Sequence, residues 1–267
     1  LNPSSAASDV YKRQGINNGP YTHDAQIVMY EGPDPDHAGQ EVAFCFNGSA
    51  GVAIVDVSNK EDMAEISSFN YSQSAYTHQG WVNEDHTFLY FNDELDEGQF
   101  GNGTRTYIAD IADLDAPTVL GFYQSDNTSV DHNLYIRDGK LYASNYMSGL
   151  RVSTFLPNGN LAPYGYFDVR PDSDTTSFYG TWSNYPYFPS GSIAISCRGV
   201  GLFMVKDPSF NPLDLAEVSA AAEVLKASPN PAMDHMVLSG MPSAASLQVV
   251  NMAGQEAVSY THLTLPT

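Results

Sequence analysis

The chain has 267 residues, of which 42% are hydrophobic and 12% aromatic, a composition typical of a globular protein with a sizeable core. Its formal net charge of −20 argues against nucleic acids and anionic membrane surfaces as partners, because both are bound through clustered cations. The sequence has no run of ~18 apolar residues and so predicts no membrane-spanning helix. Its two cysteines, Cys45 and Cys197, are too few for a disulfide framework, and whether they pair stays open.

Both ends of the chain look foreign to the protein. Residues 9–14 and 258–263 resemble translations of the two strands of a transposase end used in preparing sequencing libraries. We therefore expect residues 1–14 and 258–267 to be artefactual and to contribute nothing to the fold, and we leave His262 out of the candidate ligands. We also expect further repeat units to have preceded the first one visible.

The first repeat unit opens at His23-Asp24 and predicts strands near 26–30, 41–46, 51–57 and 64–69. Residues 51–57, GVAIVDV, are apolar at nearly every position instead of alternating. Such a run is typical of a strand that is buried on both faces of its sheet. We therefore expect this strand to lie in the middle of a sheet with further layers on each side.

The second unit opens at His78-Gln79, with strands predicted near 80–83, 87–92, 105–111 and 118–123. Between its second and third strands lies a long acidic loop, residues 92–103. A charged loop of this kind is usually solvated. Alternatively, its carboxylates supply the hard oxygen ligands that calcium prefers, although their spacing does not match an EF-hand. The candidate calcium ligands are Asp93, Glu94, Asp96 and Glu97.

The third unit begins with the polar entry Asp131-His132-Asn133 and continues with strands near 134–136, 140–144 and 150–155. The Asp138-Gly139 pair between the first two strands indicates a tight hairpin, because both turn positions need φ above zero. A fourth strand is expected near 164–169. The fourth unit, residues 179–205, carries Trp182 where the others have histidine.

The landmarks of these units recur at a nearly constant interval. His23, His78 and His132 are separated by 55 and 54 residues, and Asp56 and Asp110 are 54 apart. A period near 50 residues with about four short strands per unit is typical of propeller blades. The sequence therefore predicts an all-β fold: a β-propeller with four visible blades, truncated at its N-terminus, over residues 15–212.

The recurring histidines have two interpretations. In a propeller the first strand of each blade is innermost, so His23, His78 and His132 should meet at one mouth of the central channel. There they could bind zinc or another transition metal with one position left for water. Alternatively, each histidine is structural and bonds an aspartate of its own blade, such as Asp56 or Asp110. The candidates for the channel mouth are His23, Asp24, His78, Gln79, Asp131, His132, Asn133 and Trp182.

The composition changes after the fourth unit. Residues 213–223 are Ala-rich and acidic, which predicts a linker. Residues 224–257 contain Pro229-Asn230-Pro231, two strand-like runs and an Asn251-x-x-Gly-Gln turn. This pattern resembles the first half of a type IX secretion C-terminal sorting domain, a small β-sandwich. The resemblance implies type IX secretion machinery as a partner and delivery to the outer surface of a Gram-negative bacterium.

The blades in turn resemble the choice-of-anchor B family, which is built from LVIVD-type repeats. The resemblance covers roughly residues 20–206 and rests on the motifs around His23, 92–108, 131–135, 145–151 and 182–191. It implies an extracellular propeller but supplies no established activity and no catalytic residues. No Ser nucleophile elbow, Cys–His pair or phosphate-binding glycine loop is present.

Two functions therefore remain in view. The first is a secreted binding, adhesion or scaffold module at the cell surface, and its ligand would be an extracellular carbohydrate or protein. The alternative is a metal-dependent hydrolase with its site at the mouth of the channel. Calcium and zinc are the cofactors that the ligand chemistry predicts.

Overall fold

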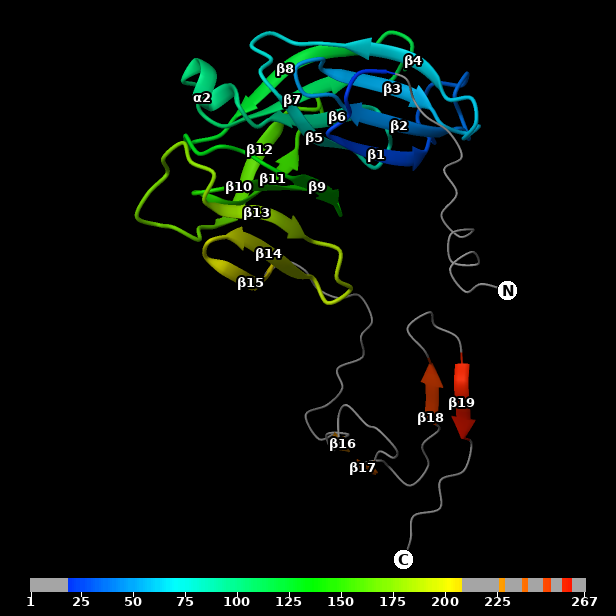
Figure 1. The fold of residues 1–267 in the computed structure, drawn as a ribbon, viewed down its shortest axis with the longest axis vertical. Coiled ribbons are helices and arrows are strands. Elements are labelled where there is room, and N and C mark those ends of the chain that lie inside the picture. The colour runs from blue at the N-terminus through cyan, green and yellow to red at the C-terminus, as the bar shows by residue number, and fades with distance from the viewer. Residues whose placement is uncertain (1–18, 208–225, 229–236, 240–246, 251–255, 261–267) are drawn as a thin grey trace, which may run out of the picture. The chain divides into compact units, whose positions relative to one another are not determined.

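The computed structural model describes residues 19–207 and four short strands after them, at 226–228, 237–239, 247–250 and 256–260. The chain divides into two compact units, Leu1–Asn211 and Pro212–Thr267. The first unit contains four antiparallel sheets, in each of which the strands are ordered as in the chain (Figure 1). The prediction of an all-β fold with four blades is confirmed, and each predicted blade corresponds to one sheet.

The four sheets share one plan, in which each strand pairs with the next. The first sheet holds β1 (Asp24–Met29), β2 (Glu41–Phe46), β3 (Val52–Asp56) and β4 (Ala64–Phe69). The second holds β5 (Thr77–Val82), β6 (Phe88–Asp93), β7 (Arg105–Asp110) and β8 (Thr118–Gln124). The third holds β9 (Leu134–Arg137), β10 (Lys140–Asn145), β11 (Gly149–Phe155) and β12 (Leu161–Phe167). The fourth holds β13 (Gly180–Tyr185), β14 (Ser192–Arg198) and β15 (Gly201–Lys206).

The acidic segment between β6 and β7 folds as a short helix, α2 (Asp96–Phe100), and not as the solvated loop that its charge predicts. Asp96 and Glu97 are buried there, although both carry carboxylates. The prediction failed because local charge density does not reveal that this segment packs against the body of the sheets. Among the residues that the structure describes, no helix is long and apolar enough to cross a membrane.

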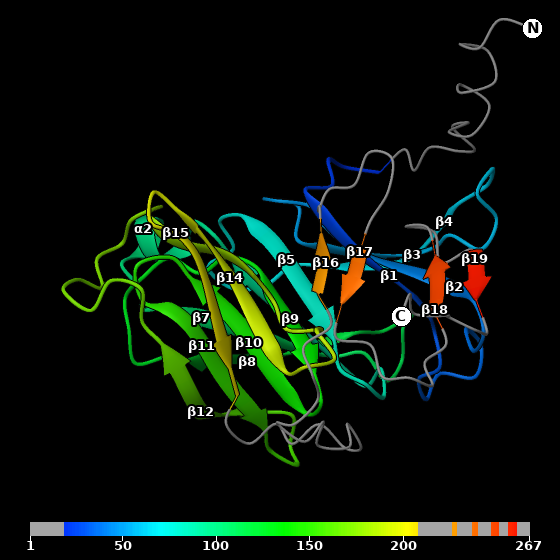
Figure 2. The same cartoon turned by 90° about the horizontal axis from the view of Figure 1, so that it is seen from below.

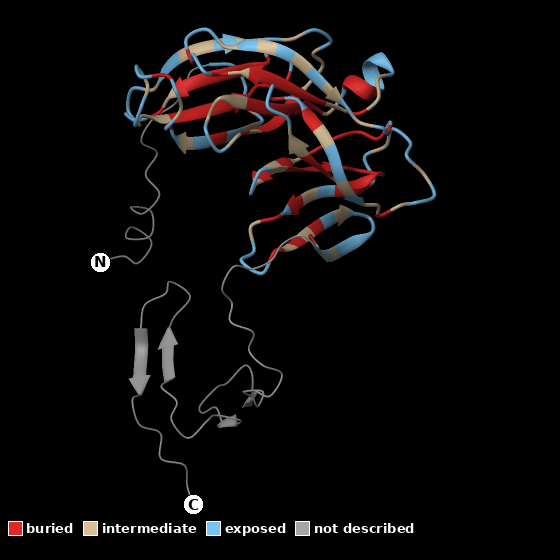
Figure 3. Cartoon of the chain, turned by 180° about the vertical axis from the view of Figure 1, so that it is seen from behind, coloured by how far each residue is buried: buried red, intermediate tan, exposed pale blue. Residues whose placement is uncertain are grey.

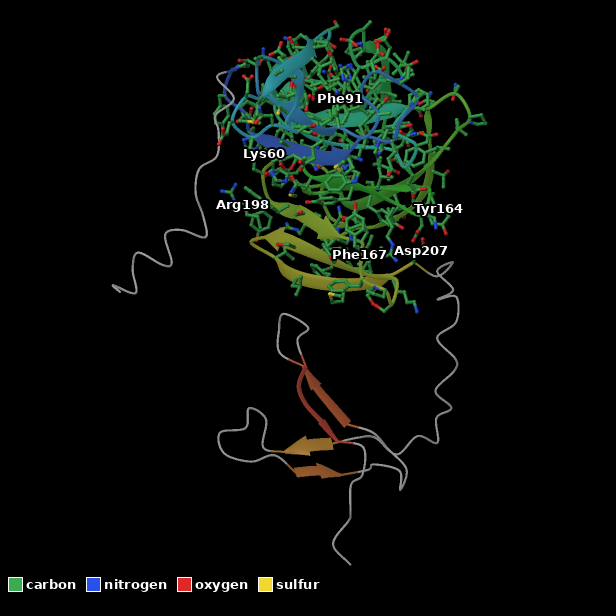
Figure 4. The ribbon with its side chains drawn as sticks, turned by 90° about the vertical axis from the view of Figure 1, so that its right-hand side faces the viewer. Lys60, Phe91, Tyr164, Phe167, Arg198 and Asp207 are labelled. Carbon is green, nitrogen blue, oxygen red and sulfur yellow. The ribbon has the colours of Figure 1, made fainter. Side chains whose placement is uncertain are left out.

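The middle strands form the core, and the fourth strands face solvent. Val52, Ala53, Ile54 and Val55 of β3 are all buried, as the unbroken apolar run predicts, whereas no residue of β4 is buried (Figure 3). Alternate residues of a strand point to opposite faces, so β3 supplies two hydrophobic clusters. One of them includes Phe91 of the second sheet, which lies among the packed side chains in Figure 4. Similar clusters join the second sheet to the third and the third to the fourth.

The first strands of consecutive sheets lie side by side: β1 contacts β5 and β5 contacts β9 (Figure 2), and β9 contacts β13 (Figure 1). Side-chain amides complete this contact. Gln26 accepts a hydrogen bond from the backbone N–H of Val82 at 2.7 Å, and Gln79 accepts one from the N–H of Leu134 at 2.8 Å. Gln79 also donates to the Leu134 carbonyl at 3.0 Å. Each buried amide thus bonds backbone groups of the neighbouring first strand that would otherwise have no hydrogen-bond partner.

The repeat extends to backbone irregularities. In the first three sheets a bulge interrupts the pairing of the third strand with the fourth, at Ile54/Val55, Ile108/Ala109 and Val152/Ser153. A bulge bends the strand and increases its local twist. The third strand is therefore bent at the equivalent place in each of these three sheets.

A glycine is the first residue of the third strand in the third sheet and directly precedes that strand in the first sheet, for a steric reason. Gly51 and Gly149 have φ angles of 80° and 81°, a left-handed region that L side chains rarely adopt. A Cβ atom on Gly149 would lie 2.1 Å from the carbonyl oxygen of Phe167, and one on Gly51 would lie 2.3 Å from that of Phe69. The neighbouring fourth strand can approach this closely only because no side chain is present.

In the second unit the structure describes strands alone: β16 (Lys226–Ser228) paired with β17 (Val237–Ser239), and β18 (Leu247–Val250) paired with β19 (Glu256–Tyr260). The predicted linker at 213–223 and the N-terminal segment 1–14 lie outside the described residues. The same holds for the Pro-Asn-Pro motif and the Asn-x-x-Gly turn of the predicted sorting domain. Both predicted domain boundaries therefore stay predictions.

Candidate metal centre

Four aromatic rings stand in a row at the entries to the first strands of the four sheets. The ring of His23 lies 4.4 Å from that of His78, measured between centroids, and His78 lies 4.2 Å from His132. Trp182 continues the row at 4.4 Å from His132. The equal spacing follows from the repeat, since each blade contributes one ring. The structure thus brings the three predicted histidines together.

The carboxylate of Glu94, the residue directly after β6, faces two of these histidines. Its Oε2 lies 3.7 Å from Nε2 of His78, and its Oε1 lies 3.5 Å from Nε2 of His132. One ligand atom from each of the three residues lies within 4.8 Å of the other two. Tyr146 donates a hydrogen bond to Oε1 of Glu94 at 2.7 Å and so fixes the orientation of the carboxylate.

Neither histidine carries the proton that an ion pair with Glu94 would need at neutral pH. Burial lowers the pKa of His78 to about 2, with His132 and His23 adding to the effect. Burial likewise lowers the pKa of His132 to about 4, against the opposing effect of its hydrogen bond to Trp182. Burial raises the pKa of Glu94, and the hydrogen bond from Tyr146 opposes this rise. Neither histidine therefore supplies a positive charge to balance a carboxylate at Glu94.

The protonation site of His132 follows from its second hydrogen bond. Nδ1 contacts the backbone carbonyl oxygen of Trp182, which can only accept, so Nδ1 carries the hydrogen. Nε2 then presents a lone pair to the carboxylate of Glu94. On His78 the buried Nδ1 has no hydrogen-bond partner. Two lone pairs that face each other are unfavourable unless a cation or a proton lies between them.

The distances from the histidine nitrogens to the Glu94 oxygens suit the ligands of a tetrahedral ion. With bonds of ~2.0–2.1 Å to nitrogen and oxygen, ligands of tetrahedral zinc lie roughly 3.3 Å apart. Nε2 of His132 lies 3.5 Å from Oε1 of Glu94 and Nε2 of His78 lies 3.7 Å from Oε2, and both distances are close to that value. Two imidazoles and one carboxylate are also a ligand set of catalytic zinc sites, in which water takes the fourth position.

The centre opens into a cavity of about 240 Å³. Besides the three ligands, its lining includes His23, Asp24, Asn133 and Trp182. His23 is exposed, and its Nδ1 lies 3.2 Å from the hydroxyl of Tyr21 and 3.0 Å from that of Tyr76. A small molecule in this cavity would therefore meet a histidine, a carboxylate and an amide beside the fourth position of the ion.

Of the other predicted channel-mouth residues, Asn133 lines the cavity, whereas Gln79 and Asp131 do not. Gln79 is buried and joins the first strands of the second and third sheets, as described above. Asn133 donates to the hydroxyls of Tyr135 and Ser183 at 3.2 and 3.1 Å. Asp131 is buried beside α2, where its backbone N–H donates to Glu97 at 3.3 Å.

The four predicted calcium ligands occupy separate positions. Asp93 accepts hydrogen bonds from the Tyr71 hydroxyl and from three backbone N–H groups, and so holds the turn before β5. Asp96 accepts from the hydroxyl of Tyr107 at 2.7 Å, Glu97 contacts Asp131, and Glu94 belongs to the histidine centre. Within the described part of the chain, no three of these four carboxylates offer oxygens within 4.8 Å of one another. The calcium site stays a prediction.

The expected pairing of each histidine with an aspartate of its own blade is wrong for Asp56 and Asp110. Their carboxylates accept the backbone N–H groups of Ser58 and Ala112 and so close their own turns. The partners of the histidines are Glu94, a backbone carbonyl and tyrosine hydroxyls, none of which a spacing argument could identify. Cys45 and Cys197 are both free thiols.

A second cluster of residues that could bind a metal, Asp34, His37 and Asp115, is explained by its hydrogen bonds. His37 bonds Asp115 at 3.0 Å and Gln40 at 2.9 Å, while Asp34 accepts the backbone N–H of Leu114. Burial lowers the pKa of His37, but the hydrogen bonds to Gln40 and Asp115 raise it above its ordinary value. This histidine can therefore take up a proton and form an ion pair, which satisfies the group without a metal.

No family model matches this chain, and no curated protein matches it. Among solved structures, the periplasmic gluconolactonase of Pseudomonas aeruginosa is similar over 83% of this chain and 66% of its own, with 16% identity and a TM-score of 0.51. A protein of unknown function from Desulfotomaculum acetoxidans shares 13% identity over 68% of this chain and 54% of its own, with a TM-score of 0.48. A Lactobacillus plantarum protein shares 14% over 67% and 52%, with a TM-score of 0.44.

The chain therefore spans about two thirds or less of the length of these proteins. At this level of identity the likeness to the gluconolactonase concerns the fold alone. Together with the four sheets, it establishes a β-propeller type of fold for the described part of the first unit.

Proposed function

We propose that this chain is an extracellular, metal-dependent hydrolase that binds one divalent transition metal ion between His78, Glu94 and His132. The observation that carries the proposal is the meeting of an unprotonated Nε2 of His132 with the carboxylate of Glu94 at 3.5 Å. A divalent cation between them removes the repulsion and uses the ligand spacing that is already present. Zinc suits the two imidazoles and the carboxylate.

When bound, such an ion lowers the pKa of a coordinated water and polarises a carbonyl oxygen. The residues of the chain have distinct tasks around it. The Trp182 carbonyl keeps His132 in the tautomer that presents Nε2, and Tyr146 orients Glu94. His23 lines the same cavity from its exposed side and is positioned to exchange a proton with a reacting group.

Cyclic or linear esters are the substrates we propose. A cavity of about 240 Å³ admits a small molecule, and His23, Asp24 and Asn133 supply polar contacts for hydroxyl groups. The Pseudomonas structure with the similar fold is called a gluconolactonase, which makes a sugar lactone the first substrate to test. Lactone opening needs only an activated water and stabilisation of the carbonyl oxygen.

A second candidate is a binding or adhesion module displayed at the cell surface. Its support is a group of exposed aromatic side chains around the fourth sheet, namely Trp182, Tyr185 and Phe188, which are 43%, 50% and 39% exposed. Such rings provide contact area for a carbohydrate or protein ligand. For both candidates, the resemblance to choice-of-anchor B and to a type IX sorting domain supports secretion from a Gram-negative bacterium, and the high negative charge suits an extracellular protein.

Metal analysis followed by an activity assay tests the proposal. The full chain is incubated with zinc or manganese, freed of unbound metal by gel filtration, and analysed for metal per chain. We expect about one equivalent in the wild type and its loss in His132→Ala and Glu94→Gln, because each variant removes one of three ligands. Release of acid from glucono-δ-lactone should follow the metal content.

The matched control is His37→Ala, which alters the cluster of Asp34, His37 and Asp115. Metal lost in His37→Ala but kept in His132→Ala would show that the centre is misassigned. One equivalent of metal without hydrolysis of the lactone or of simple esters would refute the hydrolase and favour the binding module. A chain that retains no metal at all would refute both the centre and its chemistry.

A further inference from the structure

A second cavity, of about 300 Å³, lies between the second and third sheets and shares no lining residue with the metal centre. It opens at the edge of the hydrophobic cluster that joins these sheets, among side chains of their third and fourth strands and of β10. Its size falls at the lower end of ligand pockets, which hold ~300–1,000 Å³. Three tyrosines line it: Tyr123 on β8, and Tyr164 and Tyr166 on β12.

A cation without a close carboxylate partner stands in this cavity. Arg151 on β11 lies opposite Ala143 and Tyr166, with its guanidinium carbon 4.7 Å from the centre of the Tyr166 ring. Its Nε is buried and has no hydrogen-bond partner. The nearest carboxylate, Asp126, is 3.9 Å away, and its side chain is 86% exposed.

Acidic groups are abundant in the chain, which has 31 acidic residues and only 11 basic ones. Some cations of the structure pair more closely with carboxylates than Arg151 does: Lys140 lies 2.9 Å from Asp207, and Arg170 lies 3.3 Å from Asp172. Arg151 thus keeps an edge of its guanidinium available although acidic groups are abundant. That edge has the geometry for a bidentate bond to a carboxylate.

The same cavity also contains an unused acceptor. Asn145 is 2% exposed, and its Oδ1 is buried without a partner. Asn145 pairs with Gly149 and Ala143 pairs with Arg151, so Asn145 and Arg151 lie diagonally on one face of the sheet. One cavity therefore contains a buried donor and a buried acceptor that make no hydrogen bond. Buried polar groups in native proteins are rarely left without a partner.

We infer that this cavity binds a carboxylate-bearing sugar of the uronic acid class. Its carboxylate accepts from Arg151, a hydroxyl donates to Asn145, and the pyranose ring lies against the tyrosines, whose rings combine an apolar face with a polar tip. Tyr164 belongs to the outer strand of its sheet and is labelled in Figure 4. A monoanion suits one arginine, whereas the net charge of −20 opposes a dianion such as phosphate.

Calorimetric titration of the full chain with D-glucuronate, and separately with D-glucose, tests the inference. The two sugars share the ring and differ at C6, where glucose lacks the carboxylate. We expect glucuronate to bind in the millimolar range or tighter and glucose at least tenfold more weakly, a difference of about 1.4 kcal/mol. Arg151→Gln should weaken glucuronate binding by at least tenfold and leave glucose unchanged.

Arg105→Gln is the matched control, because Arg105 also lies over an aromatic ring, at 4.2 Å from the centre of Phe122, but does not line the cavity. It should bind glucuronate as the wild type does. Equal affinity of the wild type for both sugars, or no heat with glucuronate, overturns the inference even if Arg151→Gln fails to fold. Unchanged glucuronate binding in a folded Arg151→Gln overturns it as well.

Discussion

The protonation of Glu97 can be tested by replacing it with glutamine. Glu97 is 2% exposed in α2, and Asp131 donates its backbone N–H to Oε1 while Oε2 has no partner. Burial, followed by the charge of Asp96, raises the pKa of Glu97 from 4.5 to about 9. Burial, followed by the charge of Glu97, likewise raises the pKa of Asp131. At neutral pH the folded protein therefore keeps a proton on Glu97, whereas the unfolded chain releases it.

The sign and size of the effect follow from this difference. A carboxyl with a raised pKa contributes stability that is complete below about pH 4.5 and is lost as the pH rises toward 9. The loss is about 1.4 kcal/mol per pH unit, hence about 2.7 kcal/mol between pH 6 and pH 8. This is an upper value, because Asp96 and Asp131 titrate together with Glu97 and share the proton.

Urea denaturation at pH 6, 7 and 8 gives the free energy of unfolding of the wild type and of Glu97→Gln. The amide resembles the neutral acid and cannot ionise, so the variant should gain stability relative to the wild type as the pH rises, by up to about 2.7 kcal/mol. Glu61→Gln, on the exposed surface, is the control and should show no such trend. A difference between Glu97→Gln and the wild type that stays constant over this pH range would refute a protonated Glu97.

Two further predictions concern the backbone and the second unit. Gly149→Ala should destabilise the protein by more than Gly139→Ala. Both glycines have positive φ, which costs a residue with a side chain ~1–2 kcal/mol, but only at Gly149 would the new Cβ atom meet a carbonyl oxygen. Equal losses of unfolding free energy in urea denaturation would refute the steric reasoning. Ending the chain before Ala216 should leave the melting temperature of the propeller unchanged while abolishing its display at the cell surface, whereas a melting temperature lowered by several degrees would show that the second unit helps to close the propeller.

The fold was largely predictable because it is repetitive. Apolar strands at a fixed period indicate blades, and the interval between His23, His78 and His132 was enough to predict that their rings meet. Position in a repeat reports which residues are equivalent, but not which residues from other segments reach them. Glu94 was assigned to calcium because its neighbours in the sequence are acidic, yet its carboxylate faces the histidines.

Two other features escaped prediction for the same reason. The burial of Asp96 and Glu97 could not be expected from a run of charged residues, because it depends on the packing of α2 against Asp131 and Tyr107. The cavity around Arg151 was missed for a related reason. Its tyrosines come from the outer strands of two different blades, and their order in the sequence does not reveal that they line one cavity.

The hydrogen bond from His132 to the backbone carbonyl of Trp182 has a consequence for how the sequences of neighbouring blades can differ. Every amino acid offers a backbone carbonyl, so the next blade holds His132 in its tautomer through the polypeptide chain and not through a particular side chain. Exchange of histidine for tryptophan in that blade therefore leaves the tautomer of the imidazole in the preceding blade unchanged. The side chain at this position of one blade can therefore change while the imidazole of the preceding blade keeps its tautomer.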